Sequence, residues 1–209
     1  SPPDNSYSGG LAEIIVTAEK RSMDLQDLSQ AVSAYTADAR QLAGIATLQD
    51  FAAFTPGLSY SAGNDRVFIR GIGRQTNTNG SDPGISTYTD GIYDTATASV
   101  GASDFFIERV EVLRGPQGTL YGRNSIGGAI NAISKRPTTD FRADTRVTIG
   151  TYDVFNLEAA MSGSLSSGLR ARLAGAHYGQ GKGYFKSHVG KPSEGGRGKK
   201  RYIELQLEA

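Results

Sequence analysis

Apolar and polar residues alternate along the last third of the chain. Residues 142–149, 155–162, 169–174 and 202–208 place mainly apolar side chains at every second position and mainly polar ones between them. A period of two is typical of a β-strand with one apolar face. Short turn signals separate the first three segments, and the long polar stretch 179–200 precedes the fourth. The pattern predicts four antiparallel strands.

Two kinds of protein share this pattern. A soluble antiparallel sheet alternates because one face packs on a core, whereas an outer-membrane barrel alternates because one face meets lipid. Barrel strands are about ten residues long and are joined by short turns on one side and long loops on the other. The four segments fit the barrel description better, and the soluble sheet stays open as the alternative.

Residues 31–54 predict a strand followed by two short helices. Residues 31–35 read as a strand, and Thr36 can cap a helix that runs through Leu42 and stops at Gly44. A helix that begins after a polar cap and ends at glycine is a common local arrangement.

The start of the second helix carries its own capping signal. Thr47 and Asp50 have the spacing of a capping box, in which each side chain bonds the other residue's backbone N–H. Leu48, Phe51 and Phe54 follow at helical spacing. We therefore expect all three side chains to pack in a core.

Residues 66–104 predict strands that alternate with polar loops. Residues 66–71 form a strand that ends in a G-x-G pattern, but residues 74–84 after it are a polar loop without the third glycine and helix of a dinucleotide site. Residues 85–93 predict a hairpin that turns at Asp90-Gly91. Residues 94–104 are again small and polar, which predicts a second exposed loop.

Glycine-rich turns between two strands mark the stretch 107–137. Residues 107–113 alternate as a strand with one buried face, and residues 129–134 form a second, apolar strand. Five glycines lie between positions 115 and 128. They allow positive φ angles or close approach of one backbone to another.

Three motifs in this stretch resemble the end of the plug domain of TonB-dependent outer-membrane receptors. They are Arg114-Gly115-Pro116, Leu120-Tyr121-Gly122 and Gly127-Gly128-Ala129-Ile130-Asn131, in the order that the family shows. The earlier run Phe68-Ile69-Arg70-Gly71 also resembles the family. The resemblance implies an α+β plug domain followed by antiparallel β-strands of a transmembrane β-barrel, which has about 22 strands in plugged transporters.

The resemblance also suggests a division of the chain. We expect a disordered lead at 1–10, a TonB-box segment at 11–20, a plug domain at 21–137 and the first barrel strands at 138–209. The lead is rich in Pro, Ser and Gly and has little to bury. Because four strands cannot close a barrel, we expect the sequence to be the amino-terminal part of a longer receptor.

An extended segment near the amino end resembles the TonB box of the family. On composition alone it could equally be an ordinary edge strand of the plug. In the family such a segment adds as a strand to the periplasmic protein TonB, mainly through backbone hydrogen bonds. The resemblance therefore implies TonB, with its inner-membrane energising complex, as a partner. The segment is Glu13, Ile14, Ile15, Val16, Thr17 and Ala18.

Two arginines are expected to fix the plug inside the barrel. Arg70 and Arg114 each stand between an apolar strand and a glycine turn. A charged side chain that becomes buried needs a partner of opposite charge. We expect carboxylates on the barrel wall in this role, either Glu158, Glu204 and Glu208 or residues beyond position 209.

The two polar loops are candidate contacts for a transported solute. In the family such plug loops face the cell exterior. The loops carry neither a metal-binding nor an aromatic-cage pattern, so they do not identify the solute. Candidate contact residues are Arg74, Gln75, Asn77, Asn79, Asp82 and Ser99.

The family implies import of a scarce extracellular solute, such as an iron chelate, cobalamin or a carbohydrate. The energy comes from TonB, because the outer membrane has neither an ion gradient nor ATP. The expected location is the bacterial outer membrane, in contact with lipid, with the amino-terminal segment and the plug base facing the periplasm. The alternative is a surface binding protein or adhesin that uses a plug-like domain without TonB-driven transport.

Composition and motifs argue against several other classes. Lys and Arg total 22 against 21 Asp and Glu, so the net charge of +1 does not favour nucleic acid as a partner. Without Cys there is no thiolate metal site, and His177 and His188 have no third ligand near them in sequence. Ser125 lacks the flanking glycine of a nucleophile elbow. We therefore expect no enzyme, no cofactor and no metal site.

Overall fold

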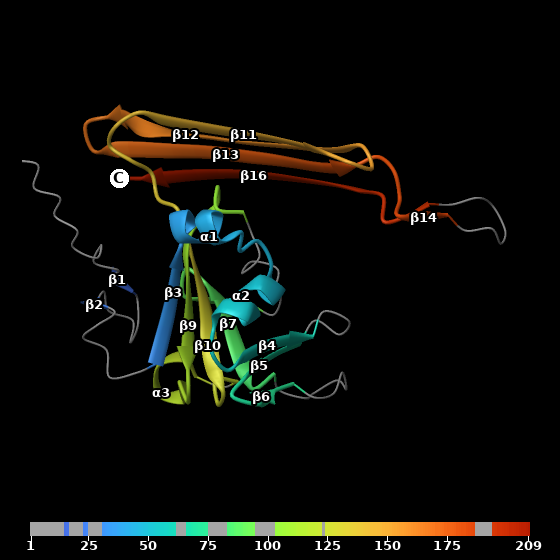
Figure 1. The fold of residues 1–209 in the computed structure, drawn as a ribbon. Coiled ribbons are helices and arrows are strands. Elements are labelled where there is room, and N and C mark those ends of the chain that lie inside the picture. The colour runs from blue at the N-terminus through green and yellow to red at the C-terminus, as the bar shows by residue number, and fades with distance from the viewer. Residues whose placement is uncertain are drawn as a thin grey trace, which may run out of the picture. The chain divides into compact units, whose positions relative to one another are not determined.

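The chain forms two compact units in a computed structural model (Figure 1). The first unit comprises Ser1–Ala102 and Arg109–Ile133, and the second comprises Ser103–Glu108 and Ser134–Ala209. The short segment 103–108 therefore belongs to the second unit, although the chain on both sides of it belongs to the first. The residues that the structure describes are 15–16, 23–24, 31–61, 66–74, 83–94, 103–122, 124–186 and 194–209.

A five-stranded mixed sheet organises the first unit. Its order is β3 (Ala31–Thr36), β9 (Ile107–Arg114), β10 (Gly128–Ser134), β7 (Ile85–Thr89) and β8 (Ile92–Asp94). Strand β10 pairs parallel with β7, whereas β3 with β9 and β7 with β8 are antiparallel. The remaining elements are β1 (Ile15–Val16) with β2 (Met23–Asp24), α1 (Ala37–Ala43), α2 (Leu48–Phe54), the small sheet β4 (Leu58–Ser61), β5 (Arg66–Ile69) and β6 (Ile72–Gly73), and α3 (Gly118–Tyr121).

The capping predictions for both helices are confirmed. Thr36 accepts a hydrogen bond from Ala39 N at 3.2 Å, and α1 ends at Gly44 with a φ of 69°. Thr47 and Asp50 form the complete capping box of α2. Hydrogen bonds from Thr47 hold the pKa of the Asp50 carboxyl below its ordinary value. Within the described part of the chain, no helix is both long and apolar enough to cross a membrane.

The prediction that three side chains of α2 share the core is wrong for Phe54. Leu48 and Phe51 are buried, but Phe54 is 52% exposed. Six residues advance an α-helix by about 600°, which places Phe54 about 120° around the axis from Leu48. Phe51 packs edge-on against Tyr35 of β3, with ring centroids 5.3 Å apart.

Strand β9 is buried on both faces, so the prediction of a single buried face is wrong. Val110, Glu111, Val112 and Leu113 all have no exposed surface. The strand lies between β3 and β10 in the sheet, where side chains of both parities are covered. The buried Glu111 carboxylate is held by Arg109 Nε at 2.8 Å.

An apolar cluster lies on the face of this sheet that carries Glu111. The hydroxyl of Tyr88 donates to the backbone carbonyl of Tyr121, and the two rings meet edge-on with centroids 5.0 Å apart. Burial, the nearby charge of Glu111 and the Tyr88 hydroxyl raise the pKa of Tyr121 to about 12. The cluster consists of Tyr88, Leu113, Tyr121 and Ala129, with Val32 and Ala34 packed against it.

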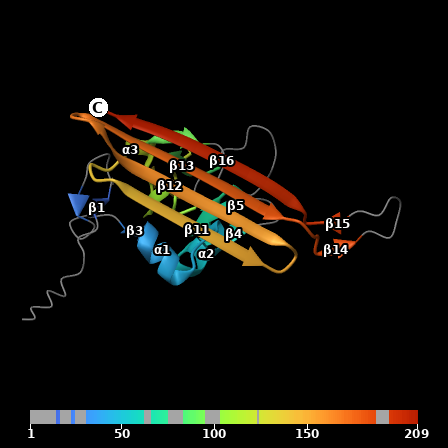
Figure 2. The same ribbon diagram turned by 90° about the horizontal axis from the view of Figure 1, so that it is seen from above.

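Four long antiparallel strands form the second unit, and Figure 2 shows them side by side. They are β11 (Arg142–Gly150), β12 (Val154–Ser166), β13 (Leu169–Gln180) and β16 (Gly198–Glu208), with a hairpin of β14 (Phe185–Lys186) and β15 (Glu194–Gly195) between the last two. Strands β13 and β16 are longer than predicted. The prediction stopped short because apolar and polar residues do not alternate over residues 175–180 and 198–201. The four predicted antiparallel strands are confirmed.

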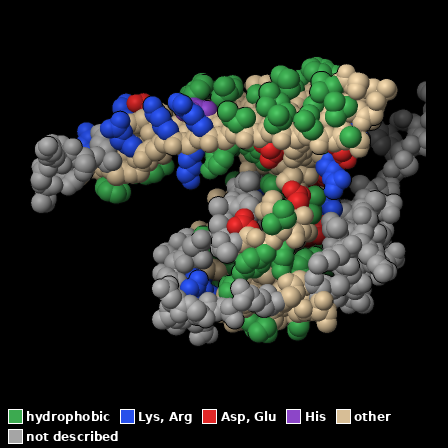
Figure 3. All heavy atoms as spheres, turned by 180° about the vertical axis from the view of Figure 1, so that it is seen from behind, with side chains coloured by type: hydrophobic (Ala, Val, Ile, Leu, Met, Phe, Trp, Pro, Cys, Tyr) green, Lys and Arg blue, Asp and Glu red, His purple; other side chains and the backbone are tan. Residues whose placement is uncertain are grey.

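The sheet of the second unit exposes its apolar side chains (Figure 3). On β16, Ile203, Leu205 and Leu207 are 84%, 65% and 63% exposed, whereas Glu204 between them is partly covered. On β12 the polar Glu158 is buried. A soluble sheet covers its apolar face, so this arrangement is that of a barrel strand set, apolar outside and polar inside.

Gly128 in the family motif sits where only glycine fits. Its φ is 152°, and a Cβ there would lie 2.3 Å from the carbonyl oxygen of Leu113. We expect Gly128→Ala to lower the free energy of unfolding by at least about 2 kcal/mol. Gly118, the first residue of α3, has nothing within 4 Å of such a Cβ, so Gly118→Ala is the matched control.

Guanidinium-induced unfolding of the purified protein measures both changes. Equal stability of the Gly128→Ala and Gly118→Ala proteins would show that the close approach of β9 and β10 at Gly128 is not required.

Candidate functional site

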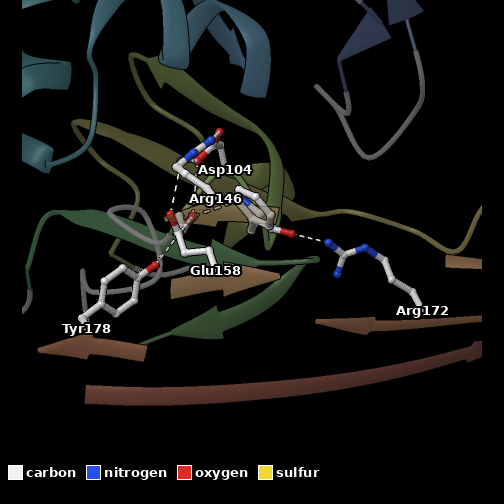
Figure 4. Close-up of polar contacts among 7 residues, drawn as sticks. Asp104, Arg146, Glu158, Arg172 and Tyr178 are labelled. Atoms are coloured by element: carbon white, nitrogen blue, oxygen red, sulfur yellow. Dashed lines mark hydrogen bonds and ion pairs between the residues drawn. The ribbon is translucent and has the colours of Figure 1, made fainter. Parts of the chain in front are cut away.

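Polar side chains from the segment 103–108 and from three strands meet inside the second unit (Figure 4). Arg146 of β11 and Glu158 of β12 are opposite each other in the strand register. Both point to the polar face of the sheet, where Tyr178 of β13 and Asp104 also lie. The cluster joins residues up to 74 positions apart in sequence.

Arg146 is the centre of this cluster. Its guanidinium binds Asp104 through both terminal nitrogens, Nη1 to Oδ1 at 2.8 Å and Nη2 to Oδ2 at 2.5 Å. Nη1 also reaches Glu158 Oε2 at 3.3 Å, and the carbon of the guanidinium lies 4.8 Å from the ring centre of Phe105. A bidentate arginine–carboxylate pair fixes the orientation of both partners.

Two carboxylates share this one guanidinium, and hydroxyl groups stabilise the second. Tyr178 donates to Glu158 Oε1 at 2.6 Å, and the Ser103 hydroxyl donates to the same oxygen. Burial alone would raise the pKa of Asp104, but the hydrogen bonds and charge of Arg146 outweigh it and leave the pKa below its ordinary value. The Asp104 carboxyl therefore stays ionised at neutral pH.

Further contacts hold the rest of the segment. The buried Arg172 of β13 donates to the carbonyl of Phe105 and pairs with Glu204 at 3.2 Å. Lys135 N donates to the carbonyl of Phe106 at 2.8 Å. The segment is thus attached through side chains at its start and through its own backbone carbonyls. These hydrogen bonds and ion pairs hold the segment 103–108 against the strands, and we call them the anchor.

Sequence reasoning missed most of this cluster. The sequence pattern places Asp104 at the end of an exposed loop and Arg146 among the alternating polar residues of a strand. Glu158 was named, but as a partner for other arginines. The signal that could have found the pair is strand parity, which puts Arg146 and Glu158 on one face once the hairpin register is known.

The TonB-box prediction falls partly within the described residues. Ile15 and Val16 form β1, which pairs antiparallel with β2 so that Ile15 is opposite Asp24 and Val16 opposite Met23. Glu13, Ile14, Thr17 and Ala18 lie outside the described residues. Binding to TonB stays a prediction.

The structure brings Arg70 and Arg114 to one turn of the first unit. Arg70 N donates to the carbonyl of Gly57 at 2.7 Å, and Arg114 Nη1 donates to the carbonyl of Pro56 at 3.3 Å. Arg114 Nε is buried and makes no hydrogen bond to any described residue. Leaving a buried N–H without an acceptor costs free energy of folding. The unmatched Nε of Arg114 is therefore consistent with an acceptor outside the described residues.

The carboxylates suggested as partners have arginines of their own in the second unit. Glu158 pairs with Arg146, Glu204 with Arg172, and Glu208 with Arg170 at 3.4 Å. The attachment of Arg70 and Arg114 to the barrel wall stays a prediction.

Of the predicted solute-contact residues, the structure describes one. Arg74 follows β6 and is partly buried. Gln75, Asn77, Asn79, Asp82 and Ser99 lie outside the described residues, so their role stays a prediction. His177 is on β13 and accepts a hydrogen bond from Arg201 at 3.3 Å.

Replacing Arg146 tests the anchor. We expect Arg146→Gln to lower the free energy of unfolding by about 2–3 kcal/mol, less than for a fully buried pair because a third of the Arg146 side chain is exposed. Arg142→Gln is the control on the same strand, since Arg142 is 72% exposed and its pair with Asp144 contributes about 0–1 kcal/mol.

Guanidinium-induced unfolding of the purified protein again provides the comparison. If the two glutamine variants lose the same stability, the cluster around Arg146 is only a set of solvated surface charges.

Comparison with known families matches residues 24–129 to the TonB-dependent Receptor Plug Domain. The chain is 31% identical over 177 residues to the ferrichrome outer membrane transporter/phage receptor of Escherichia coli K12, covering 78% of this chain and 22% of that protein. It is 31% identical over 195 residues to the ferripyoverdine receptor of Pseudomonas aeruginosa, covering 88% and 22% respectively.

A solved structure agrees on the fold. The ferric yersiniabactin uptake receptor FyuA from Yersinia pestis superposes with a TM-score of 0.72 at 22% identity, over 85% of this chain and 28% of that one. The chain spans 22% of the length of each of the two curated relatives above. The chain belongs to the TonB-dependent receptors and contains their plug domain followed by antiparallel strands of the transmembrane barrel.

Proposed function

We propose that this chain serves in TonB-driven import of a ferric siderophore across the outer membrane. The observation that carries the proposal is the 31% identity, over 78% and 88% of the chain, to a ferrichrome transporter and a ferripyoverdine receptor. Among the solutes expected of the family, these names favour an iron chelate over cobalamin or a carbohydrate.

The proposed orientation places the amino-terminal segment and the plug base in the periplasm. Strand β11 then starts at the periplasmic rim, the short turn between β12 and β13 lies at that rim, and the long connection from β13 to β16 lies at the exterior. Short turns on the periplasmic side and longer loops outside are the rule in such barrels. The division into lead, TonB-box segment, plug and barrel strands at the predicted boundaries is part of the same proposal.

The contacts around Arg146 would hold the segment 103–108 in place during the proposed transport. A pull from TonB on the amino-terminal segment must rearrange part of the plug while the barrel stays closed. The segment 103–108 is held by the ion pair of Asp104 with Arg146 and by the bond from Arg172 to Phe105. We infer that this segment stays with the barrel strands during transport.

Uptake assays on a panel of ferric siderophores test the proposed function directly. Cells that rely on this receptor for iron should take up at least one labelled ferric siderophore, and deletion of TonB should abolish that uptake. Surface binding of the same siderophore should persist without TonB. Uptake of a cobalamin or carbohydrate, with none of any ferric siderophore, would overturn the assignment of the substrate class.

The TonB-box segment is tested with a matched pair of substitutions. If strand addition to TonB uses backbone groups of β1, Ile15→Pro should abolish uptake, because proline removes an N–H and fixes φ. Ile15→Val keeps the backbone and should retain uptake near that of the unchanged receptor. Siderophore binding and receptor abundance should be unchanged in both. Normal energy-dependent uptake by the proline variant would refute the TonB-box assignment, and loss of folded receptor would make the segment an edge strand.

The proposed attachment of the plug by Arg114 predicts leakage when it is removed. Arg114→Ala would leave a carboxylate of the barrel wall without its cation, which costs about 3–5 kcal/mol if that carboxylate is buried. Passive entry of small antibiotics and dyes should rise. The exposed Arg142→Ala variant should not leak. Unchanged permeability and unfolding in the Arg114→Ala protein would show that the arginine does not hold the plug.

A further inference from the structure

Charges on the inner face of the barrel strands cancel over part of its length. Four acidic side chains of the strands point to this face, and each forms an ion pair with an arginine. They are Asp144, Glu158, Glu204 and Glu208, paired with Arg142, Arg146, Arg172 and Arg170 in that order. In the strand register all eight lie in the row of Arg146 and Glu158 or between that row and the end of the sheet where β11 begins. This part of the inner face therefore carries no net charge from its strands.

The two rows beyond Arg146 and Glu158, toward the turn between β11 and β12, hold a single charged side chain. The first row is Thr148, Asn156, Tyr178 and Lys200, and the second is Gly150, Val154, Gln180 and Gly198. Lys200 is exposed, and no residue in the described part of the chain forms a hydrogen bond or an ion pair with it. This end of the inner face is therefore positive.

An oriented aromatic ring lies beside Lys200. Tyr202 is two residues further along β16, so its side chain points to the same face. Its ring packs edge-on against those of Tyr178 and Phe106, with centroids 6.1 Å and 6.3 Å away. Tyr178 is itself fixed, because its hydroxyl donates to Glu158 (Figure 4). These two neighbours orient Tyr202 and leave 50% of it exposed.

We propose that Lys200 and Tyr202 select a ferric siderophore with catecholate groups, which is both anionic and aromatic. The proposal rests on the proposed import function and on the proposed orientation, in which this end of the inner face is nearest the cell exterior. Lys200 supplies a cation for the catecholate oxygens. Tyr202 supplies a ring for aromatic contact and a hydroxyl that forms no hydrogen bond with a described residue.

The chemistry of the chelating groups distinguishes the classes of siderophore. Each catecholate brings two negative oxygens to Fe³⁺, so three catecholates leave the complex with a strong negative charge and with aromatic rings at its surface. Three hydroxamates only neutralise the ion, and their chelating groups contain no ring. Carboxylate chelates are anionic without aromatic rings. An unpaired cation beside an oriented ring is complementary in both charge and shape to the catecholate class alone.

Three single substitutions in the full receptor test this selectivity. Lys200→Gln removes the inner cation, and Lys199→Gln removes the same charge from the adjacent residue, whose side chain points to the opposite face. Tyr202→Leu removes the ring and keeps an apolar side chain of similar length. Dissociation constants are measured on the purified receptor with three radiolabelled ferric complexes, one of a tris-catecholate, one of a tris-hydroxamate and one of a carboxylate chelator.

We expect Lys200→Gln to weaken binding of the catecholate and carboxylate complexes about tenfold, a factor between those of a contact ion pair in bulk water and near a protein surface. Tyr202→Leu should weaken the catecholate complex alone, by about fivefold, which is typical of one aromatic contact. Lys199→Gln should leave all three affinities unchanged. The unchanged receptor should bind the hydroxamate complex most weakly.

Several results would overturn the proposal. Equal losses for Lys199→Gln and Lys200→Gln would show that only the net charge of the receptor matters. Unchanged catecholate affinity in both the Lys200→Gln and Tyr202→Leu proteins, or preference of the unchanged receptor for the hydroxamate complex, would refute the selectivity and leave ferric siderophore import in place. Binding of cobalamin or a carbohydrate, with none of the three ferric complexes, would instead refute the proposed function and the selectivity with it.

Discussion

The constraint on which the second unit depends is the inverted polarity of its sheet. With apolar side chains facing outward, every charge on these strands that cannot reach water at a rim must be matched on the inner face. Arg146 and Glu158, opposite each other on β11 and β12, meet this requirement only with the help of Asp104 and Tyr178. The segment 103–108 therefore supplies part of the charge balance on the inner face of these strands, and the strands in turn hold the segment.

The sheet of the plug also buries a charged side chain among apolar ones. Its central strand β9 is covered on both faces, and it still carries the charged Glu111, which Arg109 neutralises. The close approach of β9 and β10 requires Gly128, where a side chain would meet the carbonyl of Leu113. Gly128 of the family motif is thus required by the packing of this sheet.

Caps and turns could be predicted from the sequence, whereas contacts between residues far apart in the chain could not. The capping box at Thr47 and Asp50 and the Asp90-Gly91 turn, with φ angles of 51° and 80°, depend on neighbours within a few residues and were predicted correctly. Phe54 was misplaced because spacing of three residues drifts around a helix. The Arg146 cluster could not be predicted, because it requires both the β11–β12 register and the return of Asp104 from 42 residues away.

The orientation of β16 side chains is the most direct measurement of the central claim. The chain has no native Cys, so single cysteines at Ile203, Glu204, Leu205 and Gln206 can carry nitroxide labels without interference from it. In the reconstituted receptor, labels at 203 and 205 should be relaxed by oxygen dissolved in lipid, and labels at 204 and 206 should not. Uniform accessibility, or the opposite alternation, would contradict a lipid-facing apolar surface.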